Sequence, residues 1–187
     1  EHSETAYVTE KALDYLKDRV GKKWVLHLSY VKPHWPYIAP APYHNQYTAN
    51  DIQPVSRNHK ELINPHPVYA AYLNQEESLT FSKQETVDQV RPVYMGLIEQ
   101  LDSEFGRVLK QLEESGELSN TLIIFTSDHG DLGGDHFLGE KDLFYDQVVK
   151  VPLMVFDPRQ HANSMRGRAV DELVESIDIV PTILDAL

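Results

Sequence analysis

The hydrophobic pattern at the start of the chain predicts a helix followed by a strand. Residues 4–20 form the helical pattern, with Leu13, Leu16 and further apolar side chains three and four residues apart. Charged residues lie between them, which is typical of an amphipathic helix. Residues 24–30 are apolar at most positions on both faces. This second pattern is typical of a strand buried in a parallel sheet.

A long helix is predicted in the middle of the chain. Apolar positions keep a helical period from Val90 to Leu112, and the residues from Ser82 to Glu85 have the spacing of a capping box. Pro92 would lie in an early turn of this helix. A proline there lacks the backbone N–H, so the helix is expected either to kink at this point or to start later.

Two further strands and a closing helix follow. Residues 121–126 are apolar and β-branched and predict a central parallel strand, and residues 152–156 predict another strand. A helix is expected from about Ser176 to the end. Helices alternating with strands indicate an α/β fold. In such sheets, ligands bind beyond the carboxyl ends of the strands, here after Tyr30 and after Thr126.

The segment of about 31–80 is expected to be a long irregular loop region, within a single domain that takes in residues 1–187. Seven prolines lie within residues 33–67, the first at Pro33 and the last at Pro67. Loops of this length in compact domains are usually functional or mobile.

Composition excludes several kinds of protein. With 17 Lys and Arg against 29 Asp and Glu, the net charge is −12, so nucleic-acid binding through a basic surface is not expected. No apolar run approaches the roughly 20 residues of a membrane span. The chain has no cysteine, which excludes disulfides, thiolate metal ligands and a cysteine nucleophile within it. Compartment and oligomeric state stay open.

A cluster of potential metal ligands follows the strand at 121–126. Carboxylates and imidazoles there surround several glycines: Asp128, His129, Asp131, Asp135, His136, Glu140 and Asp142. At a sharp turn after a strand, Asp128 and His129 can reach one cation, and the glycines let the backbone turn tightly. The tripeptide Asp-His-Gly taken alone is more typical of an ordinary turn with a solvated histidine.

The segment after the first strand carries basic groups. Lys32 and His34 are two residues apart, and the neighbouring prolines favour an extended backbone that projects both side chains to one side. Groups placed in this way can hold an oxyanion or protonate a leaving group. A proline-rich surface loop with incidental charges is the alternative, and this segment taken alone favours it.

Both segments would meet if both strands are central in the sheet. The combined site would hold one metal ion and at least two of the cationic or protonatable groups Lys32, His34, His136 and Lys141. Such a site suits an anionic substrate, a sulfate or phosphate ester, because transfer of the anionic group requires its charge to be neutralised. No nucleophile is identifiable.

These motifs, in this order, resemble the C-terminal part of the catalytic domain of a sulfatase, in the alkaline-phosphatase-like superfamily. The similar segments are a strand followed by Pro33-His34-x-Pro36, the run Thr121–Gly130 that contains Thr126-Ser127-Asp128-His129-Gly130, a lysine thirteen residues after Asp128, Val151–Leu153 and Ile177–Thr182. Two segments, Ala41–His44 and Gly134–His136, are most similar to the phosphonate monoester hydrolase and arylsulfatase branch.

The resemblance implies a fold and an activity. The fold would be an alkaline-phosphatase-like three-layer sandwich with a largely parallel central sheet, incomplete in this chain. The activity would be metal-dependent hydrolysis of sulfate monoesters, with a small anionic ester as the substrate.

The resemblance also implies residue roles. Asp128 and His129 would bind one divalent cation. Calcium is typical of Asp-Asn sites in the family, and the nitrogen donor leaves manganese open. His34 and Lys141 would contact the transferring group or its leaving oxygen. Lys32 and His136 would be further substrate-binding candidates on the same wall.

The chain departs from the family pattern in one large respect. The family nucleophile is a formylglycine made from a C/S-x-P-x-R motif, which this sequence lacks, together with the upstream acidic metal ligands. Both ends of the sequence look cut, so we expect a fragment that contains only part of the active site. Alone, the fragment is expected to be inactive and to bind metal weakly.

Three alternatives stay open. The first is a phosphonate monoester or phosphodiester hydrolase of the same superfamily. The second is a two-metal phosphodiesterase or mutase, although the other histidines have no spacing that supports it: His2, His44, His59, His66 and His161. The third is a non-catalytic sulfatase-like module that binds anionic ligands or a partner.

Overall fold

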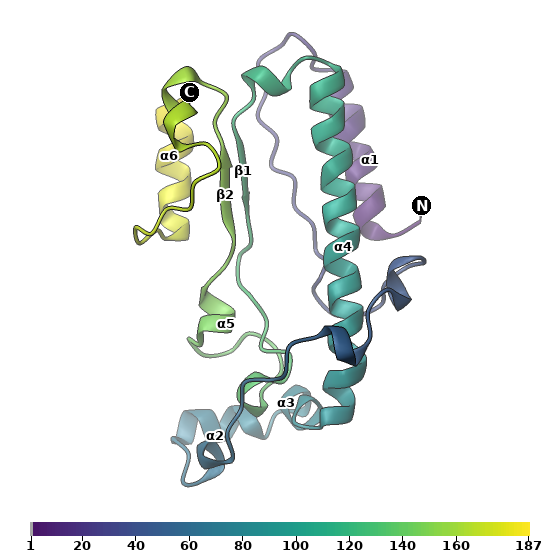
Figure 1. Cartoon of the computed structure of the whole chain (residues 1–187), viewed down its shortest axis with the longest axis vertical. Coiled ribbons are helices and arrows are strands. Elements are labelled where there is room, and N and C mark those ends of the chain that lie inside the picture. The colour runs from purple at the N-terminus through teal and green to yellow at the C-terminus, as the bar shows by residue number, and fades with distance from the viewer. Residues whose placement is uncertain (1) are drawn as a thin grey trace.

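The computed structural model describes residues 2–187. Its main elements, shown in Figure 1, are α1 (Glu4–Lys17), α2 (Pro67–Leu73), α3 (Glu76–Phe81), α4 (Gln84–Glu114), β1 (Ile123–Thr126), α5 (Asp146–Val149), β2 (Leu153–Phe156) and α6 (Ile179–Ala186). Short 3₁₀ turns connect several of them. The predicted amphipathic helix, long helix, closing helix and the strands near 121–126 and 152–156 are confirmed.

The first hydrophobic core lies between α1 and α4. The side chain of Ser3 accepts a hydrogen bond from the backbone N–H of Ala6 and so caps the start of α1. The buried side chains that join the two helices are Leu13, Leu16, Val108 and Leu112. Their spacings of three and four residues place them on one face of each helix, which is why the pattern predicted this packing.

The long helix α4 starts differently from its prediction. Ser82 ends α3, where its hydroxyl donates to the carbonyl oxygen of Leu79, so it does not cap α4. In the described chain Lys83 stands at the N-cap position with no side-chain hydrogen bond. Pro92 lies inside α4, and the helix continues past it to Glu114. Pro92 is buried, and the preceding Arg91 is hydrogen-bonded to the carbonyl oxygen of Gly133 in the loop that follows β1.

Residues 24–30 are extended but are not a paired strand. Trp24, Leu26 and Leu28 pack against the first core, whereas Val25 is 66% exposed. Within residues 2–187 no strand hydrogen-bonds to this segment. In Figure 1 it runs as a trace between β1 and α4. The prediction of a strand buried on both faces is therefore wrong for the described chain, because only one face is covered.

The two strands pair in the antiparallel direction, with Thr126 opposite Leu153 and Ile123 opposite Phe156. The prediction of a parallel strand at 121–126 is thus wrong for this pairing. A parallel connection needs a crossover that carries the chain back along the sheet. Between β1 and β2 the chain instead forms a glycine-rich loop (residues 127–140) and the short helix α5, and returns to the end of β1 that it left.

A second core supports the segment after β1. Leu132 and Leu138 are almost completely buried and pack with Tyr69 of α2 and Val148 near the end of α5. The irregular region therefore ends earlier than the predicted residue 80, because α2 and α3 form within it and cover this core.

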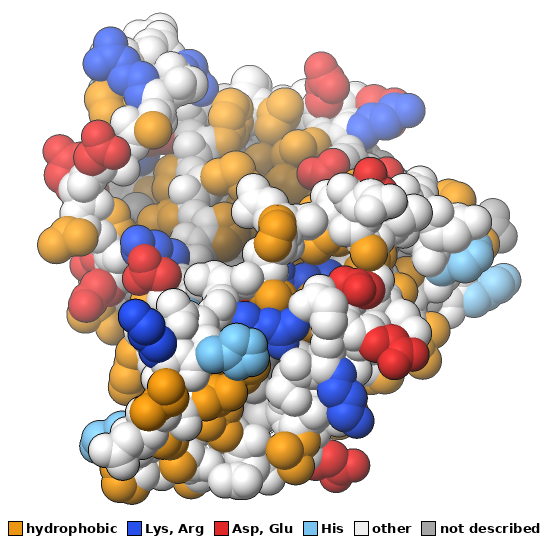
Figure 2. Space-filling model, turned by 60° about the horizontal axis from the view of Figure 1, so that its bottom comes forward, with side chains coloured by type: hydrophobic (Ala, Val, Ile, Leu, Met, Phe, Trp, Pro, Cys, Tyr) orange, Lys and Arg blue, Asp and Glu red, His pale blue; other side chains and the backbone are white. Residues whose placement is uncertain are grey.

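Much apolar surface is exposed. All four residues of β2 are between 37% and 56% exposed, and Val180 and Leu184 of α6 are exposed as well. Figure 2 shows hydrophobic side chains over one face of the molecule, including its hollow upper part. Exposed apolar areas of this kind are typical of surfaces that contact another protein, a membrane or a ligand. Among residues 2–187, no helix has both the length and the apolar character needed to cross a membrane.

Candidate functional site

The segments after Tyr30 and after Thr126 meet through His34 and Lys141. The Nε2 atom of His34 lies 3.1 Å from the Nζ atom of Lys141, although 107 residues separate them in the sequence. His34 belongs to the proline-rich loop of residues 31–42, and Lys141 follows the glycine-rich loop. The structure thus places these two predicted substrate-contacting groups side by side.

The hydrogen bonds of His34 define its tautomer. Its Nδ1 atom lies 2.9 Å from the carbonyl oxygen of Trp35, which can only accept, so Nδ1 carries a proton. Nε2 is then free to accept a hydrogen bond from the Lys141 ammonium group. Two of the three Lys141 N–H bonds remain for an anionic ligand or for Glu140, whose carboxylate lies 3.9 Å away. Burial raises the pKa of the Glu140 carboxyl, although Lys141 acts in the opposite direction.

Asp128 and His129 lie at the turn that follows β1. Nδ1 of His129 is 2.8 Å from the carbonyl oxygen of Gly130, so in the neutral ring the proton is on Nδ1 and Nε2 can bind a metal. Nε2 faces the Oδ2 atom of Asp128 at 3.4 Å. The Asp128 side chain is 82% exposed. Desolvation acts to raise the pKa of its carboxyl, but the backbone N–H and the ring of His129 lower this pKa overall.

This donor pair fits one divalent cation. Two ligands that each lie about 2.0–2.5 Å from the same ion are separated by roughly 3–3.5 Å, as these two atoms are. One carboxylate oxygen and one imidazole nitrogen form a donor set open to calcium and to transition metals. In the part of the chain that the structure describes, no group of three or more His, Cys, Asp or Glu side chains could hold a metal ion. The pair is thus a partial ligand set.

Gly130 lets α5 approach the turn that carries Asp128 and His129. Its N–H donates to the carbonyl oxygen of Val148 at 2.8 Å, and a Cβ atom on Gly130 would lie 1.9 Å from the carbonyl oxygen of Gln147. A distance this short to backbone cannot be relieved by a side-chain rotation. Glycine is therefore required here by close approach.

Gly130→Ala is expected to destabilise the protein by about 1–3 kcal/mol, because α5 must move away from the turn. Equilibrium urea denaturation followed by tryptophan fluorescence measures the change. Gly106→Ala in α4 is the matched control, since its Cβ would meet no atom of the described chain within 4 Å and helix propensity favours alanine. Equal midpoints for Gly130→Ala and wild type would contradict the expectation.

A second contact joins the same two loops. The hydroxyl of Tyr37 donates to Oδ2 of Asp131 at 3.0 Å, and Oδ1 of Asp131 accepts the N–H of Gly133 at 2.8 Å. Burial and the neighbouring Asp131 carboxylate raise the pKa of Tyr37. Burial also raises the pKa of Asp131, while the Tyr37 hydrogen bond, Gly133 and the charges of His129 and Lys141 act to lower it.

Arg91 of α4 holds the glycine-rich loop from the other side. Its guanidinium group pairs with Asp135 at 2.7 Å and donates to the carbonyl oxygens of Leu132 and Gly133. Asp135 also accepts the backbone N–H of Ser56 at 2.7 Å. Asp135 is therefore used for structure here. The sequence offered no signal for Arg91 beyond its place in a helix.

The other two candidates have partners of their own. The ammonium group of Lys32 donates to the carbonyl oxygens of His34 and Pro36, at 3.0 and 2.7 Å. Its charge is thus directed at its own loop. His136 lies 3.0 Å from a carboxylate oxygen of Glu61 and stacks on the ring of Tyr145. These contacts favour structural roles for both residues over direct contact with a substrate.

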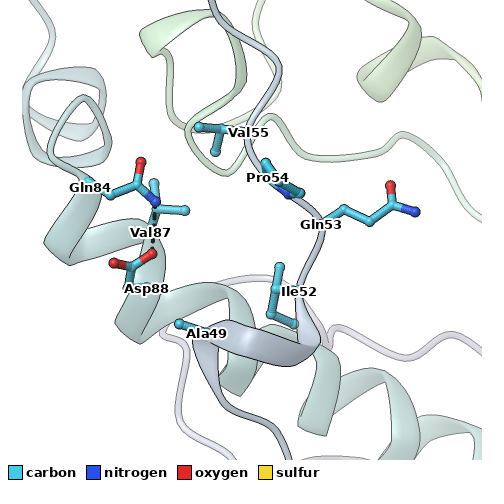
Figure 3. A pocket seen from close by; sticks show the side chains of 8 residues that line it. All are labelled: Ala49, Ile52, Gln53, Pro54, Val55, Gln84, Val87 and Asp88. Atoms are coloured by element: carbon cyan, nitrogen blue, oxygen red, sulfur yellow. Dashed lines mark hydrogen bonds between the residues drawn. The ribbon is translucent and has the colours of Figure 1, made fainter.

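Two cavities lie near the glycine-rich loop. A cavity of about 480 Å³ is lined by Tyr37, Tyr94, Asp131 and Arg91 among others, so it adjoins the contact between the two loops. Burial and the Asp131 charge raise the pKa of Tyr94 to about 12. A second cavity of about 170 Å³ lies between residues 49–55 and the start of α4 (Figure 3). None of the candidate residues lines the second cavity.

Comparison with known proteins supports a common origin with hydrolases. "Multifunctional alkaline phosphatase superfamily protein PehA" of Trinickia caryophylli is 38% identical over 199 residues, which cover 100% of this chain and 38% of that protein. An arylsulfatase of Clostridium perfringens is 31% identical over 192 residues, covering 97% of this chain and 37% of the relative. The chain thus spans less than two fifths of the length of these relatives.

Solved structures give the same result. A phosphonate monoester hydrolase from Silicibacter pomeroyi superposes with a TM-score of 0.88 at 33% identity, over 98% of this chain and 37% of the other. The phosphonate monoester hydrolase of Agrobacterium radiobacter superposes with a TM-score of 0.89 at 29% identity. The fold is accordingly alkaline-phosphatase-like and the chain holds part of it. Since a family model described as Sulfatase matches residues 2–187, the chain belongs to the sulfatase family.

Proposed function

We propose that this chain supplies one wall of the active site of a metal-dependent hydrolase that acts on sulfate monoesters. The 3.1 Å contact between His34 and Lys141 carries the proposal, because it brings two groups suited to an anionic ester together from distant loops. The partial ligand pair Asp128 and His129 supports it. The remaining ligands and the nucleophile, expected to be a formylglycine, would come from outside these 187 residues.

His34 and Lys141 would act on the substrate directly. Lys141 can donate to a non-bridging oxygen of the sulfuryl group while it still donates to Nε2 of His34. Transfer of one Lys141 ammonium proton to Nε2 would turn His34 into a donor toward the leaving oxygen and leave Lys141 as a neutral amine, while Nδ1 stays hydrogen-bonded to the carbonyl oxygen of Trp35. The loop carbonyl thereby holds the ring in one orientation through both states.

The metal-ligand pair would hold one divalent cation, calcium or manganese. Such an ion supplies Lewis-acid stabilisation of developing negative charge. Asp128 contributes the charge and His129 the directional nitrogen donor, and the Gly130 carbonyl fixes the tautomer of the imidazole.

A phosphonate monoester or phosphodiester is the second candidate substrate. The observation in its favour is the superposition on two phosphonate monoester hydrolases over nearly the whole chain. Both substrate classes present anionic oxygens and a leaving oxygen to the same side chains, so the leaving-group pocket decides between them.

A substrate comparison tests the proposal in the full-length product of the gene. We expect kcat/KM for p-nitrophenyl sulfate to exceed that for bis-p-nitrophenyl phosphate and for p-nitrophenyl phenylphosphonate. The reverse order would establish the second candidate instead. Absence of turnover with all three, together with absence of a C/S-x-P-x-R motif upstream, would support a non-catalytic anion-binding module.

A further inference from the structure

The two loops that carry the candidate residues are joined at a second point that the proposed chemistry does not use. Tyr37 lies three residues after His34, and Asp131 lies two residues after His129. The hydrogen bond from the Tyr37 hydroxyl to Asp131 therefore links the loop of the substrate-contacting histidine to the loop of the metal ligands.

Both ends of this link are rigidly held. The ring of Tyr37 meets the edge of the Phe81 ring at a centroid distance of 6.0 Å and the Tyr94 ring at 6.2 Å. Asp131 accepts the Gly133 N–H with its other oxygen, and the next residue, Leu132, is fully buried in the second core. A contact between two rigidly held groups fixes the relative position of their two loops better than a contact between mobile side chains does.

The pair His34 and Lys141 lacks comparable support. Apart from its contact with Lys141, the ring of His34 contacts the carbonyl oxygen of the adjacent Trp35 and, at a centroid distance of 5.4 Å, the Trp35 ring. The Trp35 side chain is itself 54% exposed, and Lys141 is partly exposed. Their separation thus depends on how the two loops are placed. A displacement of about 1 Å at a reacting group can lower a rate roughly a hundredfold.

We propose that Tyr37 and Asp131 are positioning residues, whose hydrogen bond sets the place of His34 relative to Lys141 and the metal-ligand pair. The proposal rests on the proposed function, since positioning matters only if His34 and Lys141 contact a substrate. Neither Tyr37 nor Asp131 touches the reacting atoms in this scheme.

Tyr37→Phe in the full-length gene product is the test, because it removes the hydroxyl and keeps the ring packed on Phe81 and Tyr94. We expect kcat to fall roughly tenfold with KM nearly unchanged and with the same urea midpoint within error. Asp131→Ala should lower kcat similarly, and Asp131→Asn should recover part of it because its amide oxygen can still accept from Tyr37. The double variant Tyr37→Phe/Asp131→Ala should be no slower than the slower single variant.

Tyr94→Phe is the matched control. It removes a hydroxyl from the adjacent ring, for which the described residues provide no hydrogen-bond partner, and it should leave kcat unchanged. Retention of wild-type kcat by Tyr37→Phe, or purely additive losses in the double variant, would overturn the positioning role.

A crystal structure of Tyr37→Phe provides a readout independent of turnover. We expect the distance between Nε2 of His34 and Nζ of Lys141 to lengthen beyond 3.1 Å. An unchanged distance would overturn the inference even in an active enzyme. A different outcome is possible, in which the unmutated enzyme hydrolyses none of the esters but the distance between His34 and Lys141 still lengthens in Tyr37→Phe. That outcome would refute the proposed function and leave the structural role of the Tyr37–Asp131 hydrogen bond established.

Discussion

Replacing Lys141 with alanine is expected to lower kcat/KM for the ester roughly 10²–10³-fold in the full-length gene product, with most of the loss in kcat. The reason is that negative charge on the non-bridging oxygens must be met by donors already in place, and removal of one such donor typically has an effect of this size. Lys141 is held beside His34 and Glu140, whereas the ammonium group of Lys32 donates to carbonyl oxygens of its own loop. Steady-state kinetics measure the effect.

Lys150→Ala is the matched control for this prediction. Lys150 is 74% exposed and pairs with Asp146 across one turn of α5, so its loss should leave activity unchanged. His34→Ala should also lower kcat, and combining it with Lys141→Ala should add little, because the two side chains are in contact. A Lys141→Ala enzyme within twofold of wild type would remove the basis for the assigned role.

Removal of divalent cations from the full-length gene product is expected to abolish its ester hydrolysis, and added calcium or manganese is expected to restore this activity. Asp128→Ala should weaken metal binding by more than about a hundredfold, since loss of an outer-shell partner of a ligand already weakens it 10- to 100-fold. Isothermal titration with each ion measures the affinity independently of activity.

The control for the metal prediction is Asp146→Asn. Asp146 is an exposed carboxylate of the same charge, and its side chain pairs with Lys150 rather than with Asp128 or His129. It should bind metal as wild type does. Full activity after exhaustive chelation, or equal affinity in Asp128→Ala, would show that these residues do not hold a required ion.

Helices α1, α4 and α6, which have a regular apolar period, were the most predictable part of the fold, whereas the short helices α2, α3 and α5 were not predicted. Burial of Leu13, Leu16 and Leu112 follows from their helical spacing, since such a pattern leaves only one face to cover. The exact start of α4 was not predictable, because Ser82 is equally able to end the preceding helix. The antiparallel direction in which β1 and β2 pair could not be predicted either, because it depends on the path of the 26-residue connection between the two strands.

The candidate site was predictable only where short motifs carry chemistry. Asp128, His129, His34 and Lys141 stand out because their residue types and spacing match the family pattern. The partners that hold these loops in place do not stand out. For example, the sequence around Tyr37 is equally compatible with a tyrosine that only packs within a loop and with one that bonds to Asp131. Likewise, the helical pattern around Arg91 does not indicate that its side chain supports the distant turn at Gly133.

The sequence alone determined the family of this protein and the residue types available to its site, because motif order and helical periodicity are properties of the linear chain. Only the tertiary structure decided which of those residues meet. His34 reaches Lys141, whereas Lys32 bonds to its own loop and His136 bonds to Glu61. These outcomes depend on contacts between residues tens of positions apart, whose geometry follows from core packing and loop closure and not from any local pattern.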